Sequence, residues 1–153
     1  MVTSASELEN PAPKPAIVPT ERNRFFWEGA RHGRLLIARC GDCGLYLHPP
    51  MPICSRCHSS HIAPAEVSGR GIVYTYTIVR RTFHPGFAAE VPYVVAMIDL
   101  VEQEGLRLIS NLVDCPHEQL AVGLAVKVRY QPHGAWMLPV FSLSSNATAE
   151  TAR

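Results

Sequence analysis

The chain has 153 residues, of which 47% are hydrophobic and 18% charged, enough for one domain or for one domain with a small module. No apolar run approaches the ~18 residues of a membrane span, and the first twenty residues do not resemble a signal peptide. We therefore expect a cytoplasmic protein without a membrane partner. The net charge of +1 provides no large cationic surface to follow a phosphate backbone, which disfavours nucleic acid as a partner.

The two ends of the chain, 1–19 and 144–153, are predicted to be disordered tails. The first tail is rich in proline, and the second has no large apolar side chain. Residues 20–36 are predicted to form a helical arm of one or two short helices, with Thr20 as the N-cap and an end near Gly33.

The two CxxC pairs in 37–64 predict a zinc ribbon. Four of the five cysteines form these pairs, and ten residues separate one pair from the other. In a reducing compartment this spacing favours a metal over disulfides. Tetrahedral Zn²⁺ takes four thiolates at about 2.3 Å, and a complete set leaves no open position for water. We therefore predict a structural zinc, with rubredoxin-like iron and a thioredoxin-like redox role as alternatives. The predicted metal ligands are Cys40, Cys43, Cys54 and Cys57.

Beyond residue 67 the sequence is typical of β-structure, with β-branched and aromatic residues on alternating faces. Breaks that contain proline or glycine separate five expected strands and leave no room for crossover helices. The expected strands are 71–79, 93–100, 106–113, 125–130 and 137–143. Five short strands predict a small antiparallel barrel of the OB-fold type over 65–143. The fold class is therefore mainly β, with N-terminal short helices, a Cys₄ zinc ribbon and a five-stranded antiparallel OB-fold barrel.

The remaining reactive side chains do not predict a self-contained enzyme. Cys115 is the only cysteine outside the two pairs, and nothing but proximity in sequence connects it to His117. No phosphate-binding loop, nucleophile elbow or HExxH motif is present in the sequence. Carboxylates in or beside the turn after the second expected strand are interpreted as solvated. Histidines near the knuckles are interpreted as surface residues or as neighbours of the ligands, rather than as ligands. These are Asp99, Glu102 and Glu104, and His48, His58 and His61.

The loop between the first two expected strands is a candidate ligand site. In an OB-fold this loop borders the ligand face. Its guanidinium, imidazole and aromatic groups suit a phosphate attached to a planar base, while the alternative is a solvated loop with its phenylalanines folded onto the barrel. The loop spans residues 80–87, with the sequence RRTFHPGF.

The order of these features resembles the OB-fold acyl-CoA-associated proteins with an N-terminal rubredoxin-like zinc ribbon, formerly classed as a domain of unknown function. The resemblance covers about Arg24 to Phe141. It rests on FFWEGARHGRLLIARC, the CxxCG knuckle, HPPMPICSRC, SGRGIVYTYTIVRR, the PGF and PYVVAMIDL segments, and VGLAVKVRY.

The resemblance implies an accessory subunit of a thiolase-type complex, not a catalyst that acts alone. Members of the family are similar to small partners of thiolases of lipid, aromatic or steroid degradation and of retro-aldolases, and some pair with MaoC-like hydratases. Such a subunit is expected to help bind acyl-CoA and to shape the partner's active-site entrance. The CoA-binding residues that the resemblance implies are Arg80, Phe83, His84 and Phe87. The resemblance implies that Phe26 and Trp27 pack the helical arm against the partner or the ribbon.

Two other functions are considered from the sequence. Zinc ribbons and OB barrels both occur in single-stranded nucleic-acid binders, whose affinity falls steeply with salt. The other alternative is an independent thioesterase or redox protein that uses Cys115 or an iron-loaded ribbon.

Overall fold

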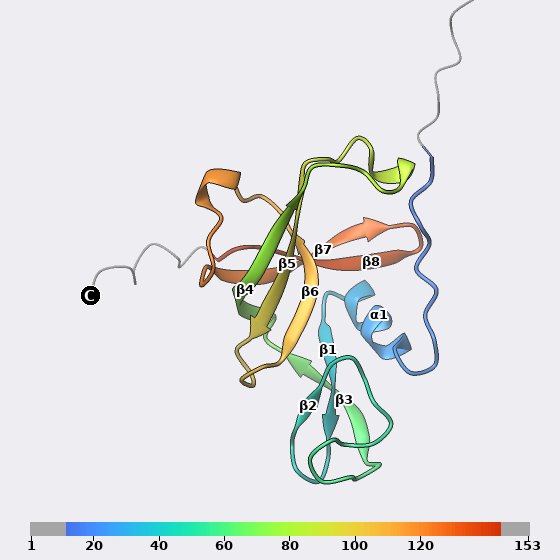
Figure 1. Ribbon diagram of the computed structural model, residues 1–153. Coiled ribbons are helices and arrows are strands. Elements are labelled where there is room, and N and C mark those ends of the chain that lie inside the picture. The colour runs from blue at the N-terminus through green and yellow to red at the C-terminus, as the bar shows by residue number, and fades with distance from the viewer. Residues whose placement is uncertain (1–11, 145–153) are drawn as a thin grey trace, which may run out of the picture.

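The computed structural model describes residues 12–144 and has a small sheet at one end and a closed barrel at the other (Figure 1). The small sheet has the order β2-β1-β3 and the barrel the order β4-β5-β6-β8-β7. Helix α1 spans Arg24–Arg31, and β1, β2 and β3 span Leu35–Cys40, Tyr46–Leu47 and Ile62–Val67. The barrel strands are β4 (Arg70–Val79), β5 (Tyr93–Leu100), β6 (Arg107–Leu112), β7 (Ala125–His133) and β8 (Trp136–Leu143). Short 3₁₀ turns η1 and η2 span Pro85–Phe87 and His117–Gln119.

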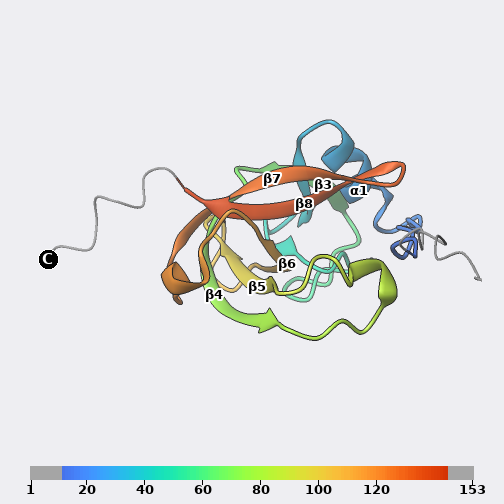
Figure 2. The same cartoon turned by 90° about the horizontal axis from the view of Figure 1, so that it is seen from above.

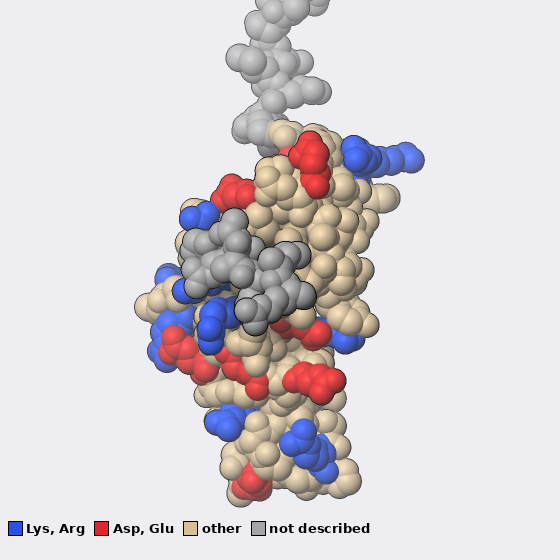
Figure 3. Space-filling view, turned by 90° about the vertical axis from the view of Figure 1, so that its left-hand side faces the viewer, with Lys and Arg blue, Asp and Glu red and all other residues tan. Residues whose placement is uncertain are grey.

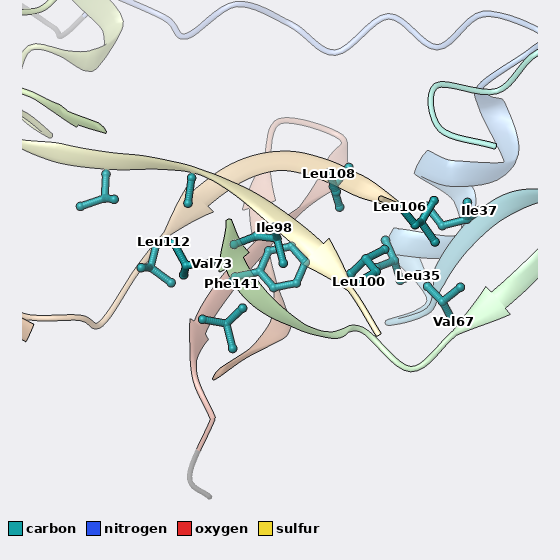
Figure 4. Packing of buried hydrophobic residues seen from close by; sticks show 13 residues of the cluster. Leu35, Ile37, Val67, Val73, Ile98, Leu100, Leu106, Leu108, Leu112 and Phe141 are labelled. Atoms are coloured by element: carbon teal, nitrogen blue, oxygen red, sulfur yellow. The ribbon is translucent and has the colours of Figure 1, made fainter. Parts of the chain in front are cut away.

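One hydrophobic core joins the barrel to the small sheet. Alternate residues of β5 are buried, as expected for a strand with one face toward a core. Phe141 is fully buried among Val73, Ile98 and Leu112, and the core continues to Leu35 of β1 (Figure 4). The ribbon end and the barrel therefore share apolar packing, which favours one relative position for the two parts.

The predicted mainly β class, with a ribbon and a five-stranded barrel, is confirmed, but the purely antiparallel barrel needs a correction. Strands β6 and β8 run parallel and pair only at Leu112 and Phe141. The other barrel pairs are antiparallel. The β7–β8 hairpin brings β8 beside β6 in the same direction, which closes the OB-type barrel. This closure is a contact between segments far apart in the sequence, so no local sequence pattern predicts it.

The helical arm contains a single helix, and Thr20 is not its N-cap. The backbone N–H of Thr20 instead donates to Oδ1 of Asn23 at 2.8 Å, and its carbonyl accepts from the backbone N–H of Arg24. These bonds form a turn ahead of α1. Residues 35 and 36 already belong to β1. No helix in the described part of the chain is long and apolar enough to cross a membrane.

The predicted disorder of 1–19 needs a correction for residues 12–19, while 1–11 and 145–153 lie outside the described residues. Lys14 forms an ion pair with Glu90, and its Nζ lies 5.4 Å from the ring centroid of Phe87. His133 contacts the carbonyl oxygen of Pro15 through Nε2 at 2.8 Å. The β4–β5 loop extends sideways from the barrel toward this segment (Figure 2). The prolines of residues 12–19 restrict this segment in the unfolded chain, so the segment loses less conformational entropy when it packs.

The turn between β5 and β6 attaches the small sheet to the barrel. Gln103 accepts from the backbone N–H of Tyr46 at 2.8 Å and donates to the Tyr46 carbonyl at 3.2 Å. Glu102 accepts from the backbone N–H of Ser68 at 2.6 Å through Oε1, and its Oε2 is buried without a hydrogen-bond partner. The expectation that Glu102 is solvated is therefore wrong, because its side chain lies under the β3–β4 connection.

Candidate functional site

The four predicted ligands form one cluster at the far end of the small sheet. Their sulfur atoms all lie within 4.8 Å of one another. Sγ of Cys40 is 3.6 Å from Sγ of Cys57, and Sγ of Cys43 is 3.5 Å from Sγ of Cys54. Four sulfurs bound to one zinc at about 2.3 Å would be roughly 3.8 Å apart, so the donor set and its dimensions fit a tetrahedral thiolate-bound metal.

The two knuckles have the same backbone conformation. Gly44 donates to the carbonyl of Cys40 at 3.0 Å, and His58 donates to the carbonyl of Cys54 at the same distance. Both residues have a positive φ, 74° for Gly44 and 59° for His58. Glycine adopts this conformation without strain, whereas a histidine there is uncommon. His58 thus performs in the second knuckle the turn that Gly44 performs in the first.

The backbone around the cluster favours thiolates. A hydrogen bond from the backbone of Cys43 lowers the pKa of Cys40 to about 6, and one from the backbone of Cys57 lowers the pKa of Cys54. The backbone of Ser59 acts in the same direction on Cys57, but the other three sulfurs outweigh it and raise the pKa of Cys57 to about 12. A fourth thiolate is costly beside its neighbours until a cation compensates the charge. The cluster is therefore suited to bind a metal through four thiolates.

The two other histidines near the cluster, His61 and His48, lie in different surroundings. His61 Nδ1 lies 3.1 Å from Oδ1 of Asp42, and this contact raises the pKa of His61. A hydrogen bond from the Ser59 side chain lowers the pKa of Asp42, and the contact with His61 lowers it further. His48 lies in the middle of the loop between the knuckles, and its ring centroid is 5.9 Å from that of Phe26. Burial lowers the pKa of His48, so its imidazole is neutral near pH 7.

The β4–β5 loop brings together only part of the predicted ligand set. His84 accepts from the backbone N–H of Gly86 at 3.0 Å, and its ring stacks edge-on with Phe87 at 6.0 Å between centroids. Phe83 is 88% exposed, and Arg80 is exposed as well. The alternative expectation is that both phenylalanines fold onto the barrel. Phe87 is only half-buried and Phe83 extends into solvent, so neither residue packs fully.

The polar hollow is a cavity of about 480 Å³ at the end of the barrel beside this loop. Its lining includes the N-terminal segment, the β4–β5 loop and the segment after β6. Cys115 and His117 both line it, and burial raises the pKa of the Cys115 thiol, which disfavours a thiolate nucleophile. We define the polar hollow by the lining residues Lys14, Phe87, Glu90, Asn111, Cys115, His117, His133 and Leu138.

The apolar hollow is a cavity of about 420 Å³ between α1, the loop between the knuckles, and strands β6 and β8. No Lys, Arg, Asp or Glu is among its lining residues. Sequence periodicity gives no signal for this site, because its walls come from segments far apart along the chain. We define the apolar hollow by the lining residues Phe26, Trp27, His48, Pro49, Val95, Ile109, Asn111 and Leu138.

Two family models match the chain. The ChsH2 rubredoxin-like zinc ribbon domain matches residues 27–62, and the ChsH2 C-terminal OB-fold domain matches residues 65–131. Their order along the chain is that of the small sheet with its cysteine cluster and the barrel.

The chain is also similar to individual proteins. It is 38% identical over 130 residues to a probable enoyl-CoA hydratase alpha subunit of Thermomonospora curvata, covering 84% of this chain but only 39% of that protein. It is 34% identical over 98 residues to a DUF35 domain-containing scaffold protein of Methanocaldococcus jannaschii, covering 63% of this chain and 67% of that one. Among solved structures, a chain of an Ltp2-ChsH2(DUF35) aldolase is 37% identical, with a TM-score of 0.75, and the match covers 85% of this chain and 98% of that chain.

Proposed function

This chain belongs to the DUF35 family, with a ChsH2-type zinc ribbon and OB-fold domain, and on this premise we propose that it is a non-catalytic accessory subunit of an enzyme complex that acts on acyl-CoA. The observation that carries the proposal is the match over 98% of a chain from an aldolase that contains Ltp2 and ChsH2. Its partner is a thiolase-fold enzyme or a MaoC-like hydratase, which supplies the catalytic residues.

The site supports a binding role more than a catalytic one. The cysteine cluster offers four thiolates to one metal, and a complete Cys₄ set leaves no open coordination position. When bound there, zinc supplies folding free energy and holds the loop between the knuckles in place. Cys115, the one cysteine outside the cluster, has a raised pKa and lies beside no described base with a hydrogen bond to its sulfur.

Two sets of side chains are assigned roles within this function. Arg80, Phe83, His84 and Phe87 of the β4–β5 loop face the CoA nucleotide. Exposed guanidinium and aromatic groups suit a phosphate and a purine ring. Phe26 and Trp27, whose rings pack edge-on at 5.0 Å between centroids, form part of the surface toward the partner enzyme.

Affinity purification of the tagged chain from its own host under mild conditions tests the proposal. We expect a thiolase-fold enzyme or a hydratase to co-elute in a fixed ratio and to lose activity toward its acyl-CoA when this chain is removed. The Cys40→Ser variant should lose both metal and partner, while the matched Cys115→Ser variant, outside the cluster, should keep both.

Recovery of the chain alone, or with RNA or DNA in a salt-dependent complex, would refute the accessory role and favour the nucleic-acid alternative. Partner binding that survives Cys40→Ser with the metal lost would show that the ribbon is dispensable for assembly.

A further inference from the structure

Residues 12–19, which we call the strap, connect two parts of the barrel that are far apart in sequence. Lys14 of the strap forms an ion pair with Glu90 of the β4–β5 loop. The carbonyl oxygen of Pro15, which can only accept, lies 2.8 Å from Nε2 of His133 at the end of β7. Figure 1 shows the strap passing from the β4–β5 loop, along the tip of the β7–β8 hairpin, to the start of α1. The strap therefore ties the loop to the hairpin.

A glycine in η1 allows the strap backbone to approach the β4–β5 loop closely. A Cβ atom at Gly86 would lie 2.9 Å from the carbonyl oxygen of Pro13 and 3.0 Å from that of Ala12. Contacts this short between a Cβ and backbone atoms require one of the two segments to move, so the packing depends on the absence of a side chain at position 86. The loop surface is thus shaped to receive another backbone.

Aromatic rings line the surface under the strap. Nζ of Lys14 lies 5.4 Å from the ring centroid of Phe87, which is 6.1 Å from that of Tyr93. Further along, a cavity of about 420 Å³ between the strap and the β7–β8 hairpin is lined by Trp136. The strap has three prolines in its eight residues, and proline-rich segments typically bind in grooves lined by aromatic rings. We call this surface the strap groove and define it by Gly86, Phe87, Glu90, His133 and Trp136.

The charge of the strap matches that of the loop. Charged side chains of both signs lie at the end of the barrel that carries the β4–β5 loop, while much of the barrel side below them is uncharged (Figure 3). Lys14 is the only charged residue of the strap, and Glu90 is the only carboxylate between β4 and β5. A lysine between two prolines is therefore the feature that the groove selects.

The contacts that hold the strap are mostly exposed. No residue of the strap is buried, and the side chains of Lys14 and Glu90 are 38% and 45% exposed. An ion pair at this exposure contributes little to stability, so the strap can open while the barrel core stays packed. Because Lys14, Phe87, Glu90 and His133 all line the polar hollow, opening the strap also uncovers that hollow.

We propose that the strap groove is a binding site for an extended segment with a lysine between two prolines, and that the strap occupies it within its own chain as a displaceable cover of the polar hollow. The partner that fits the groove is a polypeptide that presents such a segment. While the strap is bound, it holds the β4–β5 loop in one position. This inference goes beyond the proposed function and needs neither acyl-CoA nor a partner enzyme, so this chain alone suffices for its test.

Carbodiimide cross-linking tests whether the strap binds within its own chain. The reagent joins a lysine to a carboxylate in contact with it, and Lys14 and Lys127 are the only lysines of the sequence. In an equal mixture of ¹⁴N and ¹⁵N chains, we expect mass spectrometry to find Lys14 linked to Glu90 in peptides of one isotope only. Glu90→Gln should remove this link, while Lys127→Arg should preserve it. Links of mixed isotope content, which indicate exchange between two copies, would overturn the proposal, as would the absence of a link.

A fluorescein-labelled peptide with the strap sequence, APKPAIVP, tests displacement. Lys14→Glu in the full chain places a second carboxylate beside Glu90 and leaves the groove itself unchanged, so the strap should open. Fluorescence anisotropy should show about tenfold tighter peptide binding to this variant than to the original chain, because the closed strap leaves few groove sites accessible. The control peptide APEPAIVP should bind to neither chain.

Gly86→Ala obstructs the groove for the strap and for the peptide alike. We expect amide hydrogen exchange in the β4–β5 loop to become about fivefold faster and peptide binding to be lost. Ala89→Ser is the matched control, because Ala89 is exposed in the same loop and lines neither the polar hollow nor the cavity beside Trp136. Far-UV circular dichroism and bound metal report whether each variant is folded.

Three results would overturn the proposal. Equal peptide binding to the original chain and to Lys14→Glu would show that the strap does not occupy the groove. No binding to Lys14→Glu would show that the groove does not recognise a lysine between prolines. Unchanged hydrogen exchange in a folded Gly86→Ala variant would show that the strap does not hold the loop, and the cross-linking and peptide results decide the matter if that variant fails to fold.

Discussion

Replacing Gln103 with leucine should loosen the junction between the zinc ribbon and the barrel. The side chain of Gln103 forms two hydrogen bonds with the backbone of Tyr46, at 2.8 and 3.2 Å. Strand β2 has only two residues and pairs with β1 alone, so Gln103 occupies its other edge as a strand would. Each hydrogen bond contributes about 1 kcal/mol, and unpaired polar groups add to the loss, so the free energy of unfolding should fall by about 1–3 kcal/mol.

For a chain of this size that loss lowers the unfolding midpoint by about 3–8 °C, measured by circular dichroism on the zinc-loaded protein. Gln119→Leu is the matched control, because Gln119 is exposed in η2 and its side chain has no hydrogen bond to the described chain. We expect that variant to stay within about 0.5 kcal/mol of the original protein. Equal midpoints for the two variants would refute the idea that Gln103 holds the ribbon on the barrel.

Metal should be released as the pH falls from about 8 to about 5, because protons compete with the metal for thiolates such as Cys40, whose pKa is about 6 in the metal-free cluster. A chromophoric chelator measures the released metal, and retention of the metal over this whole pH range would contradict a thiolate site. The pKa of His61, measured by NMR titration, should lie above its ordinary value and return toward that value in the Asp42→Asn variant. Because the folded-state pKa is raised, the contribution of the His61–Asp42 pair to stability is lost as the pH rises through that pKa. An unchanged His61 pKa in the variant would exclude Asp42 as the cause of the shift. Phe141→Ala should cost about 3–5 kcal/mol of unfolding free energy, while Phe83→Ala, at a ring that is 88% exposed, should change it little, as denaturant unfolding can show.

The sequence predicts well those features that depend on interactions between residues close together along the chain. A CxxC turn brings its two sulfurs together through backbone geometry within a few residues, so the four ligands follow from spacing alone. Strand β5 follows from its nearly continuous run of apolar residues, YVVAMIDL. In both cases the determining interactions lie inside the segment or repeat along it.

The features that sequence does not predict depend on partners far along the chain. Strand β3 contains proline, alanine and glutamate, which have little preference for strands, and it forms because β1 pairs with it from Leu35 to Cys40. The closure of β6 on β8, the buried position of Glu102 Oε2 and both hollows likewise depend on residues far along the chain. The β4–β5 loop shows the converse, since its composition indicated a ligand site but could not show that His84 would cap η1 while Phe83 stays in solvent.

The metal site and the apolar hollow are connected by a single segment of chain. The loop between the knuckles begins after Cys43 and ends at Cys54, and between these two ligands it supplies His48 and Pro49 to the wall of the hollow. The ring of His48 packs on Phe26 of α1, which lines the same hollow. A metal that fixes both ends of this loop therefore also fixes one wall of the apolar hollow, although no residue of that wall is a metal ligand.

Loss of the metal should then release the loop and open the hollow, while the barrel core around Phe141 remains packed. In this way a metal with no open coordination position can determine the shape of the apolar hollow without taking part in any chemistry.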